Sequence, residues 1–160
     1  MPPKTNKKEA KTAATIENRR ARYDYSFVEE FEAGIVLVGS EVKSIFLGRA
    51  HLTDAYCRVI DSELYLINFE IEPYEQAGIF GHERRRDRKL LMHRKQIENL
   101  DRRSKEKGLT IVPTRVYFNQ RGKAKVRIAL ARGKAEYDKR QKIAENETRR
   151  EIERACTLTR

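Results

Sequence analysis

Few residues in this chain have the type and spacing that catalysis requires. The three histidines, His51, His82 and His93, are not at the i,i+4 spacing of a helical metal site, and none lies beside a cysteine motif. The sequence also has no nucleophile elbow and no glycine-rich phosphate loop before a helix. We therefore predict no catalytic residue, no bound metal and no cofactor. A nuclease that uses His82 or His93 with Glu83 is the alternative, and RNA cleavage would reveal it.

Residues that can hold RNA are more abundant. The segment Asn-Arg-Arg-Ala-Arg over residues 18–22 lies directly before Tyr23, so donors for phosphate adjoin a ring that can stack on a base. The densest cationic run is Arg-Arg-Arg-Asp-Arg-Lys over residues 84–89, and we predict that it binds phosphates. A solvated loop is the alternative for this run.

The charge of the chain is large and unevenly distributed. It has 35 Lys and Arg against 24 Asp and Glu, a formal net charge of +11. Residues 23–83 carry three basic and twelve acidic side chains, whereas residues 84–131 carry sixteen basic and four acidic ones. Such a basic half favours a polyanionic partner, because neutralising phosphates releases condensed counterions. A merely solvated surface is the alternative. No segment joins a basic face to a strongly apolar one, so we predict no membrane partner.

Length and composition predict one domain with a hydrophobic core and charged ends. The 160 residues are 39% hydrophobic and 37% charged. No apolar run approaches the roughly 18 residues of a membrane span, and no apolar region of a secretion signal follows the basic start. Cys57 and Cys156 do not form a disulfide framework. We therefore predict a cytoplasmic protein with reduced thiols.

The first part of the chain is predicted to contain an arm, a strand and a helix. Residues 1–17 lack apolar periodicity and are predicted to form a disordered basic arm. Residues 23–38 are rich in aromatic and β-branched residues, interrupted at Gly34. A short helix capped by Ser40 is expected to end at Gly48. Its apolar face consists of Val42, Ile45 and Phe46.

The middle of the chain is predicted to form a hairpin, a loop and a second helix. Residues 56–60 and 64–67 are strand-like on either side of a favourable turn. Residues 72–89 are predicted to form a long basic loop. The helix that follows ends at Gly108. The residues spaced along its apolar face are Leu90, His93, Ile97 and Leu100.

Two further strands complete the predicted domain. Residues 110–118 contain Pro113, which indicates an edge position or a bulge. Residues 125–130 alternate between apolar side chains and a basic outer face. Several short strands with two modest helices suggest a mainly β domain over residues 18–132, a small OB-like barrel. Residues 133–160 have too few apolar side chains for a docked helix, and we predict a basic tail that is disordered when free and helical when bound.

Five blocks of the sequence resemble, in order and in spacing, the small protein B family of bacteria, whose members bind transfer-messenger RNA (SsrA RNA). The blocks are Asn18–Tyr25, Glu30–Ile35, Gly39–Ser44, Arg85–Arg94 and Ala131–Arg140. The resemblance implies a six-stranded antiparallel OB-like β-barrel with flanking short helices. It also implies an RNA-binding protein that is not an enzyme and does not bind DNA.

The resemblance further implies a function in trans-translation. Family members bind the tRNA-like domain of transfer-messenger RNA and deliver it to stalled ribosomes, where the RNA tags the unfinished peptide. Elongation factor Tu and alanyl-tRNA synthetase are implied as partners reached through the RNA. The tail of the protein is expected to occupy the decoding centre of the small subunit and, as a helix, the empty messenger channel. A general RNA chaperone is the alternative within the same class, and it would bind structured RNAs equally.

Residues are carried over from the family by position. The expected RNA-binding residues are Asn18, Arg19, Arg20, Tyr23, Glu32, Arg85, Arg86, Arg88, Lys89, Leu91 and Lys125. The expected ribosome-binding tail residues are Gly133, Lys134, Tyr137, Asp138, Lys139 and Arg140. The chain departs from the family at three positions: Arg84 replaces a usual Pro, Ala135 a usual Lys, and Thr148 a common Trp.

Overall fold

The computed structural model describes residues 13–158, apart from the side chains of residues 136 and 137. Most of the predicted N-terminal arm, residues 1–12, therefore lies outside the described residues. The strands are β1 (Ile16–Glu17), β2 (Tyr25–Ile35), β3 (Ala50–His51), β4 (Tyr56–Ile60), β5 (Glu63–Ile67), β6 (Glu70–Ile71), β7 (Arg88–Leu91), β8 (Thr110–Phe118) and β9 (Ala124–Gly133). The helices are α1 (Arg19–Asp24), α2 (Gly39–Phe46), η1 (Glu75–Phe80, a 3₁₀ helix), α3 (Arg94–Lys107) and α4 (Glu136–Leu158).

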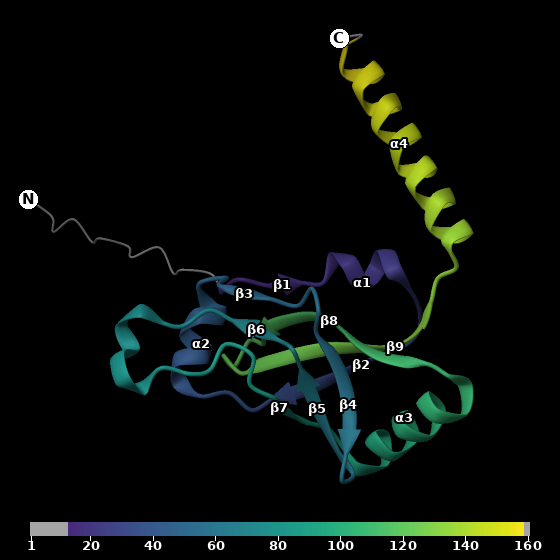
Figure 1. Ribbon diagram of the computed structural model, residues 1–160. Helices are drawn as coiled ribbons and strands as arrows, with labels where there is room; N and C mark the ends of the chain where they lie inside the picture. The colour runs from purple at the N-terminus through teal and green to yellow at the C-terminus, as the bar shows by residue number, and fades with distance from the viewer. Residues whose placement is uncertain (1–12, 159–160) are drawn as a thin grey trace, which may run out of the picture.

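Within the described chain, six antiparallel strands close into a ring. The order is β8-β4-β5-β7-β2-β9, and β9 pairs again with β8, which confirms the predicted six-stranded barrel. β1 adds to β8 outside the ring, and β3 pairs with β6 in a separate small sheet. Figure 1 shows α2 at one side of the barrel, α3 below it, and α4 projecting away from it. Closure removes the open sheet edges that would otherwise invite aggregation.

The core lies inside the barrel and follows from strand alternation. Val126, Ile128 and Leu130 of β9 point inward and are fully buried, as the period-2 pattern predicts. Leu64 and Leu66 of β5 meet them from the other side of the same hydrophobic cluster. The predicted hairpin of β4 and β5 is confirmed, with its two turn residues in the left-handed region. Pro113 lies beside a shift of register between β8 and β9, which confirms the predicted bulge.

The N-terminal segment is more ordered than predicted. Ile16 is buried and pairs with Val116, so the arm expected over residues 1–17 does not extend through β1. α1 was not predicted, because six residues are too short to show helical periodicity. It packs on the outer face of the barrel, where Ala21 contacts the cluster that contains Ala129 and Ala131. The basic outer face predicted for β9 therefore ends after Arg127.

Two other predictions about helices need correction. α2 is capped at Val38, not Ser40. Its buried residues are Glu41, Ser44 and Ile45, whereas Phe46 of the predicted apolar face is partly exposed. α3 ends at Gly108 in the left-handed conformation, as predicted. It begins only at Arg94, however. Leu90 belongs to β7, and His93 precedes the helix with an exposed side chain.

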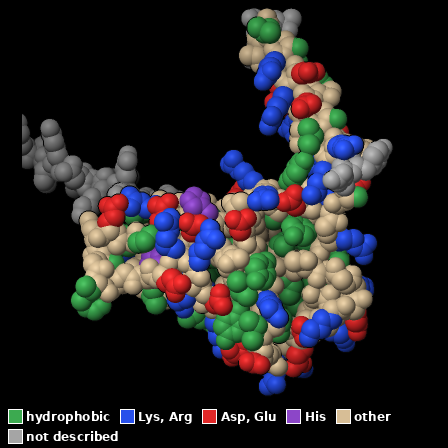
Figure 2. All heavy atoms as spheres, viewed as in Figure 1, with side chains coloured by type: hydrophobic (Ala, Val, Ile, Leu, Met, Phe, Trp, Pro, Cys, Tyr) green, Lys and Arg blue, Asp and Glu red, His purple; other side chains and the backbone are tan. Residues whose placement is uncertain are grey.

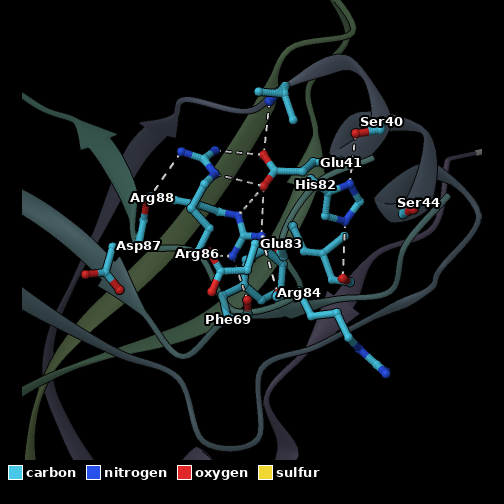
Figure 3. A network of polar contacts seen from close by, with 12 residues as sticks. Ser40, Glu41, Ser44, Phe69, His82, Glu83, Arg84, Arg86, Asp87 and Arg88 are labelled. Carbon is cyan, nitrogen blue, oxygen red and sulfur yellow. Dashed lines mark hydrogen bonds and ion pairs between the residues drawn. The ribbon is translucent and has the colours of Figure 1, made fainter. Parts of the chain in front are cut away.

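The predicted loop over residues 72–89 contains η1 and the start of β7. Its residue Arg88 forms a buried ion pair with Glu41 of α2 (Figure 3). Arg88 and Glu41, 47 residues apart, each have 0% side-chain exposure and lie 2.8 Å apart. Arg86 donates to the other oxygen of Glu41 at 2.9 Å, and the backbone N–H of Val38 donates to it at 3.0 Å. Arg88 also donates to the carbonyl of Phe69 at 2.6 Å. The network joins α2 to the start of β7.

The environment of this pair keeps both groups charged. Burial alone would raise the pKa of Glu41, but hydrogen bonds from Arg86, from the Val38 backbone and from Arg88 outweigh it and hold that pKa below its ordinary value of 4.5. Burial lowers the pKa of Arg88, and Glu41 opposes that shift. Arginine stays protonated at neutral pH in proteins, so Arg88 remains charged.

We predict that Glu41→Gln destabilises the fold at pH 7 by about 3–5 kcal/mol, because it leaves the charge of Arg88 buried without its partner. The folded pKa of Glu41 lies below the unfolded value, so its stabilisation is present above pH 4.5 and is lost as the pH falls through the folded pKa. The difference between Glu41→Gln and the parent should therefore shrink in acid. Urea unfolding at pH 7 and at pH 4 and below measures both effects.

Glu63→Gln is the matched control. It also removes a carboxylate from a cation, Lys89, but that pair is exposed at the surface. Water screens such a pair, so the urea midpoint should change little. Equal losses in Glu41→Gln and Glu63→Gln would show that the buried network does not stabilise the fold.

Candidate nucleic-acid interface

Three of the predicted RNA-binding residues meet on the outer face of the barrel. Gly34 of β2 pairs with Leu91 of β7 on one side and with Lys125 of β9 on the other, and Lys125 pairs with Tyr117 of β8. These residues form one row across four strands. Leu91 is 53% exposed. A Cβ at Gly34 would lie 3.3 Å from the Cβ of Leu91, so glycine lets this side chain lie flat across β2.

A second row on the same face carries charges of both signs. Glu32 pairs across the strands with Arg127, and Arg127 pairs with Arg115. The hydroxyl of Tyr117 donates to the carboxylate of Glu32, while the guanidinium of Arg115 lies 5.3 Å from the centre of the Tyr117 ring. Burial, and then the hydrogen bond to Glu32, raise the pKa of Tyr117.

We name the two rows together the outer-face patch. Its members are Glu32, Leu91, Arg115, Tyr117, Lys125 and Arg127. Sequence analysis did not single out Arg115 and Tyr117 as binding residues. Their alternation with the buried Val116 was visible in the sequence, but only the pairing of β8 with β9 places them beside Lys125.

α1 adjoins this patch. Glu17 of β1 pairs with Arg115, and Arg19 begins α1 two residues later with an exposed side chain. The predicted RNA-binding residue Asn18 is only 4% exposed. Its amide oxygen accepts from the N–H of Ala21 at 3.0 Å, and its amide nitrogen donates to the carbonyls of Leu52 and Pro113. In this structure Asn18 therefore caps and positions α1.

Two other predicted residues of α1 are placed differently from each other. Arg20 is exposed and pairs with Asp24 at 3.3 Å and with Asp54 at 3.4 Å. These three side chains line a pocket of about 380 Å³. Tyr23 is half-buried. A phosphate bound here would compete with two carboxylates for Arg20.

The cationic run at residues 84–89 is not one phosphate-binding surface. Arg88 presents no side chain to a phosphate in this structure, because its guanidinium is fully buried on Glu41. Arg85 pairs with Glu70 at 3.0 Å, as Arg84 does at 2.9 Å. Lys89 pairs with Glu63 at 2.5 Å. Arg86 is partly exposed but holds Glu41, so the run is largely neutralised by neighbouring carboxylates.

The predicted tail residues follow the end of β9. Gly133 closes the pairing with Tyr25, and the rest of the set lies in α4 or just before it. Lys139 pairs with Asp24, and Asp138 and Arg140 are exposed. The side chain of Tyr137 lies outside the described residues. α4 is helical over Glu136–Leu158, the part of the chain predicted to become a helix on the ribosome.

The described part of α4 has no continuous apolar stripe. Figure 2 shows Lys and Arg side chains mixed with Asp and Glu along it. Arg149 pairs with Glu153 at 3.2 Å along the helix. Ile143 and Ile152 are both exposed. α4 therefore carries many charged side chains, with exposed apolar ones among them.

The side chain of His82 has two structural partners. Ser40 Oγ lies 2.8 Å from His82 Nδ1, and His82 Nε2 lies 3.2 Å from the carbonyl oxygen of Ile71. His82 thus joins α2 to the loop before β7 (Figure 3). No cluster of three potential metal ligands occurs among residues 13–158, and none of the helices described there is long and apolar enough to cross a membrane.

Comparison with known proteins gives one consistent result. The sequence profile described as "SmpB protein" matches residues 15–158. The chain is 55% identical over 146 residues to the SsrA-binding protein of Symbiobacterium thermophilum, covering 91% of this chain and 92% of that protein. It is 55% identical over 139 residues to the SsrA-binding protein of Moorella thermoacetica, covering 87% and 90%.

A solved structure extends the comparison to three dimensions. It is described as "tmRNA-SmpB: a journey to the center of the bacterial ribosome" and matches this chain with a TM-score of 0.66 and 49% identity. The match covers 77% of this chain and 86% of that one. Since the profile spans nearly all described residues and the relatives match over most of their lengths, the chain belongs to the SmpB family of SsrA-binding proteins.

Proposed function

We propose that this chain is an RNA-binding adaptor of trans-translation. It binds the tRNA-like domain of transfer-messenger RNA and brings that RNA to ribosomes stalled without a codon. The names of its relatives support the RNA partner, and the solved SmpB structure supports the ribosome. The single observation that carries the proposal is the outer-face patch, where Glu32, Leu91 and Lys125 lie together on adjacent strands.

The chemistry of the patch suits folded RNA. Lys125 and Arg127 supply cations for phosphates, which give affinity without sequence preference. Tyr117 offers a ring for stacking, and Leu91 an apolar contact. Glu32 accepts hydrogen bonds from base amino groups, which only some bases offer, so it adds selectivity. The patch thus combines general and selective contacts.

The tail is proposed to act on the ribosome. Gly133 to Arg140 would lie in the decoding centre of the small subunit, and α4 would lie in the empty messenger channel. The 23 residues of α4 give a helix of roughly 35 Å. Its many charged side chains and the lack of a continuous apolar stripe suit an RNA-lined channel better than a hydrophobic groove.

We also propose the compartment and the further partners of the protein. The protein acts in the bacterial cytoplasm, and it binds RNA without performing catalysis. Elongation factor Tu and alanyl-tRNA synthetase are proposed as partners that it meets through the RNA. Structural contacts already engage two of the residues that could have suggested catalysis. His82 lies within hydrogen-bond distance of Ser40, and Arg88 is buried on Glu41.

Competitive RNA binding tests the proposed function. The tRNA-like domain, ordinary tRNA and plain duplex RNA compete for the protein over a salt series. A preference for the tRNA-like domain that persists at about 0.15 M salt, where exposed charges are substantially screened, supports the adaptor. Equal binding of all three RNAs, falling steeply with salt, would overturn it in favour of a general RNA chaperone.

Lys125→Gln should weaken RNA binding and reduce the slope of log K against log salt by about 0.7–1, because one phosphate contact is lost. Lys105→Gln is the matched control. Lys105 is an exposed lysine that lies on α3 and pairs with Asp101 at 2.8 Å. It should leave the slope unchanged. Identical slopes in the two variants would remove the outer-face patch from the interface.

Truncation after Gly133 should separate RNA binding from ribosome rescue. The barrel pairings end at Gly133, so the shortened protein should fold and bind the tRNA-like domain within about five-fold of the parent. Peptide tagging in a reconstituted translation system should be lost, because the proposed decoding-centre segment is absent. A truncated protein that folds but no longer binds RNA would contradict this division.

A further inference from the structure

The start of the tail is held against the C-terminal end of α1. The backbone N–H of Lys134 donates to the carbonyl of Asp24 at 2.9 Å. The side chains of Lys134 and Lys142 both donate to the carbonyl of Arg22 at 3.2 Å. The ammonium of Lys139 lies 3.3 Å from the carboxylate of Asp24. Figure 1 shows the link from β9 to α4 passing beside this end of α1.

Asp24 is shared between the tail and the RNA-binding side of α1. Its Oδ1 pairs with Lys139 of α4, and its Oδ2 pairs with the Nε of Arg20 at 3.3 Å. An RNA phosphate that binds Arg20 would compete with Asp24 for its guanidinium. The same carboxylate therefore touches both proposed functional regions of the chain.

The position of Asp24 is unfavourable for α1 alone. It is the last residue of a six-residue helix, where the helix dipole is negative and disfavours a carboxylate. The carbonyls of Arg22 and Asp24 add to this negative charge. Three lysines of the tail converge on the site, and removal from water, together with the nearby ammonium of Lys142, lowers the pKa of Lys134. Tertiary contacts, not local helix stability, account for an acid here.

We propose that Asp24 is a positioning residue that couples RNA binding at α1 to docking of the tail. The inference rests on the proposed function. When an RNA phosphate takes Arg20, Asp24 is left to Lys139, and the tail docks more firmly. By reciprocity, a docked tail weakens the hold of Asp24 on Arg20 and raises RNA affinity. Because surface ion pairs are weak, the coupling is about two- to five-fold.

The chain carries a natural position for the measurement. Cys156 is exposed on α4, whereas Cys57 is buried and burial raises the pKa of its thiol. A maleimide dye therefore labels Cys156 selectively. Time-resolved anisotropy of the dye then reports how freely α4 moves relative to the barrel. The tRNA-like domain of transfer-messenger RNA is the added probe.

In the parent protein, RNA should reduce the independent motion of α4. Asp24→Asn should increase that motion before RNA is added and abolish the response to RNA. Asp24→Glu should restore both. Lys139→Gln leaves the barrel untouched and should reproduce the extra motion, so the docking contact is tested even if Asp24→Asn unfolds α1.

Asp54→Asn is the matched control. It removes the other carboxylate partner of Arg20, at 3.4 Å, without changing Asp24. It should keep the parent's tail motion and the parent's response to RNA. Equal tail motion in Asp24→Asn, Lys139→Gln and Asp54→Asn would overturn the docking contact. A normal RNA response in a folded Asp24→Asn would overturn the coupling. Failure of the parent to bind the RNA would instead reject the proposed function, and the coupling with it.

Discussion

The buried pair of Glu41 and Arg88 is the contact on which the closed barrel depends. Two charges taken from water need good partners. Here the Val38 N–H and the Arg86 guanidinium donate to Glu41, and the carbonyls of Phe69 and Arg86 accept from Arg88. Arg88 is the first residue of β7, a four-residue strand that is the link between β5 and β2. Without β7 the ring of strands would be open. The ion pair therefore fixes the strand that also carries Leu91 to the outer face.

The proposed RNA interface is a consequence of strand register rather than of charge density. Most cations of the basic run at residues 84–89 form ion pairs with carboxylates of the same chain, such as Glu41, Glu63 and Glu70. The outer-face patch has fewer cations, but its side chains come from four different strands. It also contains a carboxylate and an aromatic ring, which a purely electrostatic surface does not need. This composition suits a partner that must be told apart from other RNAs.

α1 connects the two ends of the proposed mechanism. It is short, it is capped by the buried Asn18, and it lies on the small side chains of Ala129 and Ala131. Its first turn adjoins the outer-face patch, and its last turn receives the tail. A helix of six residues has little stability of its own. Its position is thus set by the barrel beneath it. In the proposed coupling, RNA binding at its first turn alters docking of the tail at its last turn.

Local pattern was enough to predict the strands with clear alternation, the hairpin of β4 and β5 and the bulge at Pro113, and ordered motifs were enough to predict the family. Which charged side chains are buried and which are exposed depends instead on the tertiary structure. Arg88 and Lys89 are neighbours in one basic run, yet the first is buried and the second is exposed, since successive residues of a strand face opposite sides. Likewise, Asn18 became a buried cap, because its partners Leu52 and Pro113 lie far away in the sequence. Long-range pairing sets such contacts, and no local pattern encodes it.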